Sequence, residues 1–236
     1  MNWKTIELWW TRLLDFLSPR LCTVCGRRLA ATEHSLCTSC LLHLPRTGFE
    51  YDPEGNPMAM LFWHHTKIEK AAALFYYEPH ALSARLIYKM KYGDRDDVCY
   101  DMGRIMATAM ADSSLMDGIS LLVPVPLSAR RSRQRGYNQS LLLAEGVSSI
   151  TGIAVGKDVL RRSSFLKSQT QLSRHERQKN VENVFSLQNA RLAEGKHIML
   201  IDDIATTGAT LAACANALAA VPGVSISVLT LGFTKR

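Results

Sequence analysis

Two neighbouring acids are followed directly by a turn that suits an anion. Asp202 and Asp203 end an apolar run, and three threonines and a glycine follow between Thr206 and Thr210. Carboxylates accept hydrogen bonds from hydroxyls, whereas backbone amides at the start of a helix, with threonine hydroxyls beside them, bind phosphate. Helix capping alone would explain a Thr/Gly turn, but it does not require two acids as well. A sugar phosphate would satisfy both halves, with its hydroxyls at the acids and its phosphate at the turn.

The net charge of the chain favours anionic ligands, and the absence of two phosphate-binding motifs excludes two classes of nucleotide site. The chain has 28 Lys and Arg against 21 Asp and Glu, a formal charge of +7, which favours anionic partners. Nucleic acid, phosphorylated metabolites and an anionic membrane surface all remain open on charge alone. The sequence contains no G-x-x-x-x-G-K-[ST] loop for a triphosphate and no G-x-G-x-x-G loop for a dinucleotide.

Four of the six cysteines have the spacing of a zinc site. Cys22 and Cys25 form one Cys-x2-Cys hook, and Cys37 and Cys40 form a second after eleven intervening residues. Two hooks offer four thiolates to one Zn²⁺ and leave no position for water, so the ion would be structural. His34 is a substitute ligand, but four cysteines suffice, and a reducing cytosol disfavours disulfides. We predict a closed zinc site that folds a short segment.

Two basic segments indicate further contacts with anions. The first is the loop at 126–129 with the arginines that follow it, Arg130, Arg131, Arg133 and Arg135. One guanidinium group can donate two parallel hydrogen bonds to the oxygens of a phosphate. The run of arginines therefore favours anion binding over a solvated basic loop with no ligand. The second segment, 161–179, is rich in Arg, Lys, Ser and Gln. It would serve either as a loop that closes over a reacting centre or as a nucleic-acid groove, and the sequence does not decide between them.

The elements that must position these residues alternate between strands and helices. The expected strands are 71–77, 120–125, 197–201 and 224–233, and the expected helices are 81–92, 98–111, 139–150 and 208–220. This alternation predicts an α/β fold with a mostly parallel sheet flanked by helices. Asp202 and Asp203 would then emerge at the carboxyl end of a strand, where ligands bind in such folds.

A small N-terminal region is expected before this fold. Turn-forming residues at 47–57 indicate a linker, so we place an N-terminal helix and the four-cysteine domain at 1–55 and the α/β domain at 56–236. Apolar residues within 3–18 recur at helical spacing, which fits a helix packed on its own protein better than a membrane-surface or docking helix. No apolar run spans a bilayer, and acidic and basic residues interrupt any signal-peptide core. A cytoplasmic location is therefore expected.

The stretch HIMLIDDIATTGA resembles the phosphoribosyl pyrophosphate (PRPP) motif of type I phosphoribosyltransferases: an apolar run, two acids and a phosphate turn. Three further segments and the four-cysteine knuckle are similar to the ComF family of competence-associated, phosphoribosyltransferase-like proteins, which includes GntX-type DNA-utilisation proteins. Those segments are LIYKMKYGD, PVPLSARRSRQRGYNQ and QTQLSRHERQKNVENVF. Together they span nearly the whole chain, and the type I phosphoribosyltransferase fold is the one this resemblance implies.

The resemblance also implies roles for individual residues. Asp202 and Asp203 would hold the ribose 2′- and 3′-hydroxyls of PRPP. The 5′-phosphate would lie on Ala205, Thr206, Thr207, Gly208, Ala209 and Thr210. The pyrophosphate, with Mg²⁺, would lie on Leu127, Ser128, Arg130 and Arg131.

Two functions follow from these assignments. In the first, the chain is a PRPP-binding protein of DNA uptake or DNA utilisation that contacts single-stranded DNA and other competence proteins. In the second, it is an active phosphoribosyltransferase of nucleotide salvage, which transfers ribose 5-phosphate to a nitrogen acceptor and releases pyrophosphate. The ComF family includes proteins that bind PRPP without turnover, so binding and catalysis are separate questions.

Overall fold

The computed structural model describes residues 19–63, 66–93, 95–163 and 184–235. The chain divides into two compact units, Met1–Leu44 and Pro45–Arg236. The helix expected at 3–18 and most of the basic segment at 161–179 lie outside the described residues. Within the described residues, no helix is long and apolar enough to cross a membrane.

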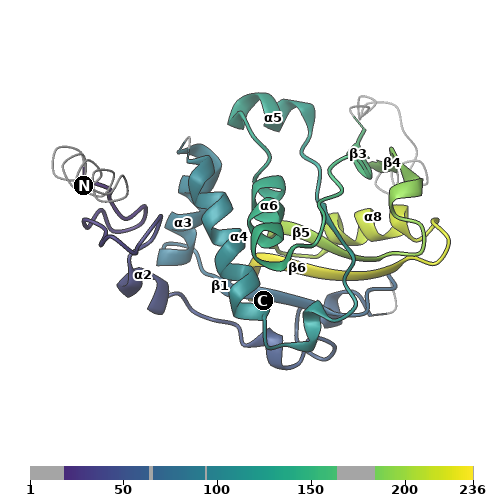
Figure 1. Ribbon diagram of the computed structural model, residues 1–236, viewed down its shortest axis with the longest axis horizontal. Coiled ribbons are helices and arrows are strands. Elements are labelled where there is room, and N and C mark those ends of the chain that lie inside the picture. Colours follow the sequence, from purple (N-terminus) through teal and green to yellow (C-terminus); the bar gives the residue numbers. More distant parts are fainter. Residues whose placement is uncertain (1–18, 64–65, 94, 164–183, 236) are drawn as a thin grey trace, which may run out of the picture. The chain divides into compact units, whose positions relative to one another are not determined.

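The second unit is built on a four-stranded parallel sheet (Figure 1). Its strands, in spatial order, are β1 (Ala71–Tyr77), β6 (Ser225–Thr234), β5 (His197–Ala205) and β2 (Leu121–Pro124). Every neighbouring pair is parallel. All four residues of β2 are buried, as are eight of the ten residues of β6, so these strands are buried on both faces. The expected α/β fold with a mostly parallel sheet is confirmed.

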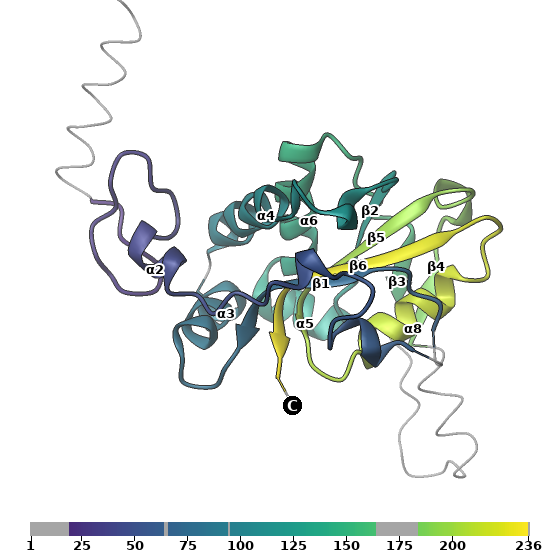
Figure 2. The same ribbon diagram turned by 90° about the horizontal axis from the view of Figure 1, so that it is seen from below.

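Helices cover both faces of this sheet (Figure 2). The four longer helices are α3 (Leu82–Tyr92), α4 (Asp96–Met110), α6 (Gln139–Thr151) and α8 (Ala209–Leu218). α4 and α6 lie side by side over one face, whereas α8 lies on the opposite face (Figure 2). This arrangement buries the apolar residues of the sheet from both sides.

Glycines allow α4 and α6 to approach closely. A Cβ atom on Gly103 of α4 would lie 2.1 Å from the carbonyl oxygen of Leu143. A Cβ atom on Gly146 of α6 would lie 2.1 Å from the carbonyl oxygen of Tyr100. Because side chains at these positions would collide with backbone, the two glycines set the separation of the helices. The contact fixes α6, whose first turn faces the acid pair described below.

The segment that leads into the second unit is anchored along β1. The amide of Tyr76 donates to the carbonyl of Pro45, and the amide of Ala71 donates to the carbonyl of Pro53. The buried side chain of Asn56 donates to the carbonyl of Ala71. Residues 47–57, which the sequence marks as a linker, are therefore held against the sheet by hydrogen bonds to its backbone.

The short elements that the sequence did not predict include one helix and two strands of the second unit. The helix α5 (Ala129–Arg135) contains the first run of arginines. The strands β3 (Leu160–Arg162) and β4 (Phe185–Leu187) form an antiparallel pair on either side of residues 164–183. Three-residue strands are too short for a periodic pattern to indicate them.

Candidate functional site

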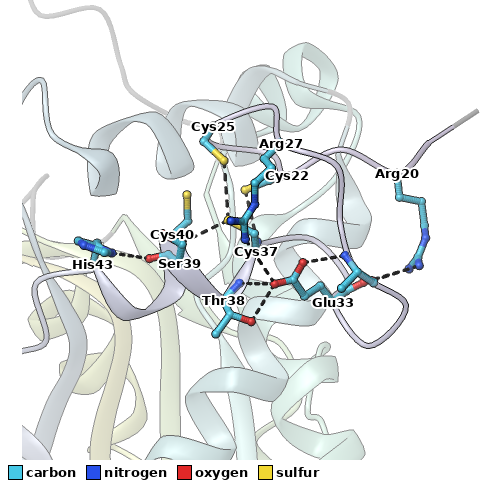
Figure 3. Close-up of polar contacts among 11 residues, drawn as sticks. Arg20, Cys22, Cys25, Arg27, Glu33, Cys37, Thr38, Ser39, Cys40 and His43 are labelled. Atoms are coloured by element: carbon cyan, nitrogen blue, oxygen red, sulfur yellow. Dashed lines mark hydrogen bonds and ion pairs between the residues drawn. The ribbon is translucent and has the colours of Figure 1, made fainter.

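The four cysteines predicted to bind zinc form one cluster in the first unit (Figure 3). Their sulfur atoms all lie within 4.8 Å of one another, and the Sγ atoms of Cys25 and Cys37 are 3.7 Å apart. Tetrahedral Zn²⁺ with Zn–S bonds of about 2.3 Å would separate its sulfur ligands by about 3.8 Å. All four cysteines are free thiols. The cluster could therefore hold a metal ion such as zinc.

Local backbone hydrogen bonds shape this cluster. The Sγ of Cys22 accepts from the amide of Cys37, and the Sγ of Cys37, which precedes α2 (Thr38–Leu42), accepts from the amide of Cys40. Burial opposes ionisation of Cys22, but amide donors including those of Cys25 and Cys37 lower its pKa to about 6. Burial and the neighbouring thiols raise the pKa of Cys40. A bound cation would favour the thiolate form at every ligand.

Glu33 stabilises the loop between the two Cys-x2-Cys hooks through hydrogen bonds. The sequence alone does not predict this role. One carboxylate oxygen accepts from the amide and the hydroxyl of Thr38, at 2.6 and 2.8 Å (Figure 3). The other accepts from the amide of Ala30 at 2.8 Å. These donors lower the pKa of Glu33 to about 2, so the carboxylate is charged at neutral pH.

In the second unit, the acid pair lies within the last part of β5 rather than beyond it. The strand continues to Ala205, four residues past the expected end, so Asp202 and Asp203 point to opposite sides of it. An open hollow follows the strand. It is lined by Asp202, Ile204, Ala205, Thr206, Thr207, Gly208, Ala209, Thr210 and Leu211. One of the two predicted acids, Asp202, thus meets the predicted phosphate-binding residues at one hollow.

The turn between β5 and α8 depends on Gly208. This residue has φ of +75°, and a Cβ atom on it would lie 3.0 Å from Cε1 of Phe62 and 3.3 Å from Cδ1 of Leu61. Only glycine combines that backbone conformation with such close approach. Thr206, Thr207 and Thr210 are exposed around it, and α8 has no acidic residue in its first turn. The start of α8 therefore presents amides and hydroxyls without a repelling carboxylate.

Asp202 is held by two donors. Its Oδ1 accepts from the hydroxyl of Ser140, in the first turn of α6, and from the amide of Asp203, both at 2.9 Å. Burial and the charge of Asp203 nevertheless raise the pKa of Asp202 to about 7. The carboxyl group is therefore oriented by the fold, and it loses its proton at a higher pH than an ordinary aspartate.

Asp203 has a cationic partner that the sequence did not identify as a site residue. Nζ of Lys91, at the end of α3, lies 2.9 Å from Oδ2 of Asp203. Both side chains are mostly buried, with 21% of the lysine and 15% of the aspartate exposed. Asp202 points to one side of β5, and this ion pair of one negative and one positive charge lies on the opposite side of the strand.

The second predicted anion loop lies beside the acid pair. β2 pairs with β5 so that Pro124 is opposite Ile201, and the amide of Val125 donates to the carbonyl of Ile201. Because both strands end at the same edge of the sheet, the loop at 125–128 lies next to the end of β5. Ser128 caps α5 by accepting from the amide of Arg131. Leu127 and Ser128 are part-buried, whereas Arg130 and Arg131 are exposed.

Residues 135–140 connect these parts of the site. Tyr137 and the buried Gln139 both donate to the carbonyl of Met90, next to Lys91. Asn138 donates to the carbonyl of Val125 in the β2 loop, and Ser140 donates to Asp202. One segment thus positions α3, the β2 loop and the acid pair. These four side chains carry no charge, and for this reason a search for chemistry-bearing residues passes over them.

Comparisons with known proteins identify relatives across most of the chain. No family model matches it. The DNA utilization protein YhgH of Salmonella typhi is 26% identical over 210 residues, which cover 85% of this chain and 91% of that protein. Competence protein F of Haemophilus influenzae is 25% identical over 210 residues, covering 84% and 90%. Competence protein ComFC of Bacillus subtilis is 39% identical over 101 residues, which are 42% of this chain and 38% of that one.

Two solved structures are similar in part. The structure of the allosteric regulatory enzyme of purine biosynthesis has a TM-score of 0.42 at 20% identity, over 60% of this chain and 29% of that one. The glutamine PRPP amidotransferase from B. subtilis has a TM-score of 0.41 at 19% identity, over 60% and 30%. This chain therefore spans less than a third of either enzyme. Proteins named for DNA utilisation and competence thus match most of the chain at 25–26% identity, and these matches support its similarity to the ComF family.

Proposed function

We propose that the chain is a PRPP-binding protein that acts in DNA uptake or DNA utilisation. The observation that carries the proposal is the junction of β5 and α8, where a carboxylate and a Thr/Gly turn share one hollow and a second carboxylate adjoins it. A ribose 5-phosphate has hydroxyls for the acids and a phosphate for the turn. The neighbouring β2 loop supports the rest of the assignment, because PRPP carries a pyrophosphate on the same sugar.

In this proposal each part of the site takes one part of the ligand. Asp202 and Asp203 accept hydrogen bonds from the ribose hydroxyls, and residues 205–210 bind the 5′-phosphate through amides and threonine hydroxyls. The β2 loop, with Arg130 and Arg131 at the start of α5, holds the pyrophosphate. Mg²⁺ held with the pyrophosphate at this loop would neutralise part of the negative charge.

The proposed role in DNA handling rests on the relatives. Proteins named for DNA utilisation and competence match most of the chain, and the chain's charge of +7 favours an anionic polymer. We propose that the protein contacts single-stranded DNA and other competence proteins in the cytoplasm. The four-cysteine cluster would hold Zn²⁺ as a structural ion, since it leaves no position for a substrate.

Catalysis is the second candidate, and the intact acid pair favours it. A nitrogen nucleophile would form a bond to C1′ of PRPP while the C1′–O bond to pyrophosphate breaks, and the pyrophosphate would leave with the bonding electrons. Positive charge develops on the ribose, where a carboxylate stabilises it, and negative charge develops on the pyrophosphate, where arginines do. The chain would then be a phosphoribosyltransferase as well as a PRPP-binding protein.

A calorimetric titration with PRPP and Mg²⁺ tests binding, and a screen of nucleobases and amines for pyrophosphate release tests catalysis. Asp203→Asn should abolish Mg-dependent pyrophosphate release and weaken PRPP binding, because the amide also offers a donor where only acceptors fit. Asp112→Asn, an exposed acid just after α4, is the matched control and should change neither. Full PRPP affinity in Asp203→Asn would contradict the assigned site, and absence of release with every acceptor would exclude the enzymatic candidate.

A further inference from the structure

Two neighbouring helices of the second unit carry cations and exposed tyrosines but no acid. α3 contains three basic residues and α5 contains four, and neither contains Asp or Glu. We call the outward part of these helices the tyrosine–arginine surface. It consists of Arg85, Tyr88, Lys89 and Tyr92 of α3 with Arg133 and Arg135 of α5.

The residues of α3 on this surface form one stripe. They recur at positions 85, 88, 89 and 92, which lie on one side of a helix, and all four are exposed. The opposite side of α3 carries Leu86, Ile87 and Met90, which are buried. Packing against the core therefore explains the apolar residues on the inner side of α3, but it does not explain the two tyrosines on the outer side.

The two tyrosines are large exposed aromatic groups held in a fixed arrangement. Tyr88 is 62% exposed and Tyr92 is 53% exposed, and their rings are 5.1 Å apart at an angle of 44°. The guanidinium of Arg135 lies 5.6 Å from the ring centre of Tyr92. Arg135 also donates a hydrogen bond to the side-chain oxygen of Gln139. The side chain of Gln139 is buried and donates in turn to the carbonyl of Met90 in α3. The arginine from one helix is thus locked beside the aromatic pair of the other.

Stability of the helix does not explain this exposure. A tyrosine pair four residues apart on a helix contributes only about 0.2–0.5 kcal/mol. Exposed aromatic rings next to arginines are instead the features of surfaces on which bases stack while their phosphates meet cations. Duplex DNA hides the faces of its bases, so the matching ligand is single-stranded.

We propose that the tyrosine–arginine surface binds single-stranded DNA, an inference that rests on the proposed role in DNA handling and gives it a location. Bases stack on Tyr88 and Tyr92, and the phosphates between them contact Arg85, Lys89 and Arg133. Tyrosine and arginine are also enriched at protein interfaces, so they do not by themselves separate the two kinds of partner. Single-stranded DNA is favoured because both helices carry basic residues and no acid, which matches a polyanion. Lys91 of the same helix reaches Asp203, so the bound strand passes next to the PRPP site.

The test measures fluorescence anisotropy of a labelled oligothymidylate of about 20 nucleotides with the full-length protein. The double variant Tyr88→Ala/Tyr92→Ala should weaken binding at least about tenfold, because stacking on one aromatic contributes about 1–3 kcal/mol per base. Tyr88→Phe/Tyr92→Phe keeps the rings and should keep the affinity. Tyr51→Ala, at a tyrosine that is 89% exposed in the 3-10 turn Phe49–Tyr51, is the matched control and should bind like the wild type.

A second series tests the phosphate contacts. Arg85→Gln/Lys89→Gln should lower the slope of log affinity against log salt concentration by about 0.7 for each lost contact. Unchanged oligonucleotide affinity in the double alanine variant would overturn the assigned surface, and so would equal binding of duplex and single strand. PRPP affinity, measured on the same variants, separates the two proposals. Retained PRPP binding in a wild-type protein that binds no oligonucleotide would reject the DNA surface alone.

Discussion

Adjacent carboxylates in β5 meet different surroundings, and this difference separates their roles. Asp202 faces the first turn of α6 and accepts from Ser140, whereas Asp203 pairs with Lys91 of α3. The pKa of Asp202 is raised because burial and Asp203 both oppose its charge. The positive charge of Lys91 lowers the pKa of Asp202 in part, because it favours the carboxylate form. A single lysine therefore affects both acids.

Replacement of this lysine should weaken the site. In Lys91→Met, Asp203 loses its cation and the site becomes more negative, so we expect affinity for PRPP with Mg²⁺ at pH 7.5 to fall about tenfold or more. Calorimetric titration measures the change. Lys89→Met removes an exposed lysine from the same helix, two residues away, and should leave PRPP affinity unaltered. Equal affinities of both variants and the wild type would show that the ion pair plays no part in binding.

Asp202 should also leave a pH signature on stability. Its pKa rises from an ordinary 3.8 to about 7 on folding, so between these values the folded protein holds a proton that the unfolded chain has lost. Stability contributed by this group therefore falls as the pH rises from about 4 to about 7. Asp202→Asn has no such proton and accepts the same hydrogen bonds at Oδ1. Relative to the wild type, it should be more stable at pH 8 than at pH 4.5 by about 3 kcal/mol.

Chemical denaturation at the two pH values checks this expectation. The quantity to compare is the free energy of unfolding of the variant minus that of the wild type, because other acids change in both proteins alike. Asp112→Asn, at an exposed position, should give the same difference at both pH values. If Asp202→Asn behaves in the same way, the carboxyl group is not protonated in the folded protein.

At the scale of elements, the β5–α8 junction determines where an anion can lie. Gly208 has a positive φ and sits against Phe62, so the turn cannot accept a side chain without moving. Gly208→Ala should destabilise the protein by about 1–2 kcal/mol through backbone strain alone. It should also lower PRPP affinity at least about tenfold, because the amides of the turn would shift.

A second glycine separates strain from binding. Gly152 follows α6 with φ of +72°, and a Cβ atom on it would have no neighbour within 4 Å, so Gly152→Ala introduces strain without a collision. It should lower the melting temperature and leave PRPP affinity as it is. Calorimetry and thermal unfolding on both variants provide the comparison, and an equal loss of affinity in both would point to general destabilisation.

At the scale of the whole molecule, the chain has two units with different sources of stability. The second unit has a buried parallel sheet, whereas the described part of the first is a short segment around four cysteines. Such a segment lacks the apolar area needed to fold without a cross-link or a metal. Loss of metal should therefore affect the two units unequally.

Cys37→Ser should reduce the zinc content of the purified protein from about one ion per chain to nearly zero, as measured by atomic absorption. Limited proteolysis should then cleave within 19–44, while the unit that begins at Pro45 stays intact and binds PRPP. Cys99→Ser, in the buried side of α4, should retain its zinc and resist cleavage. Zinc retained in Cys37→Ser would contradict the four-ligand site.

The sequence alone determined much of this molecule. Strand β1 and the positions of all four longer helices follow from periodic apolar residues and their turn signals, because burial imposes those periods directly. The cysteine spacing and the run of two acids before a Thr/Gly turn likewise identify chemistry, since a ligand requires those atoms close together in the chain. Such features depend on neighbours within a few residues.

The tertiary structure decided what depends on residues distant in the chain. Lys91 and Asp203 are separated by 112 positions and Ser140 and Asp202 by 62, and no local pattern announces either contact. The segment 135–140 became a positioning element only when its partners in α3, the β2 loop and β5 were known. The outward pairing of Tyr88, Tyr92 and Arg135 has the same origin. Sequence specifies which groups can do chemistry, whereas packing between helices and strands determines which of them meet.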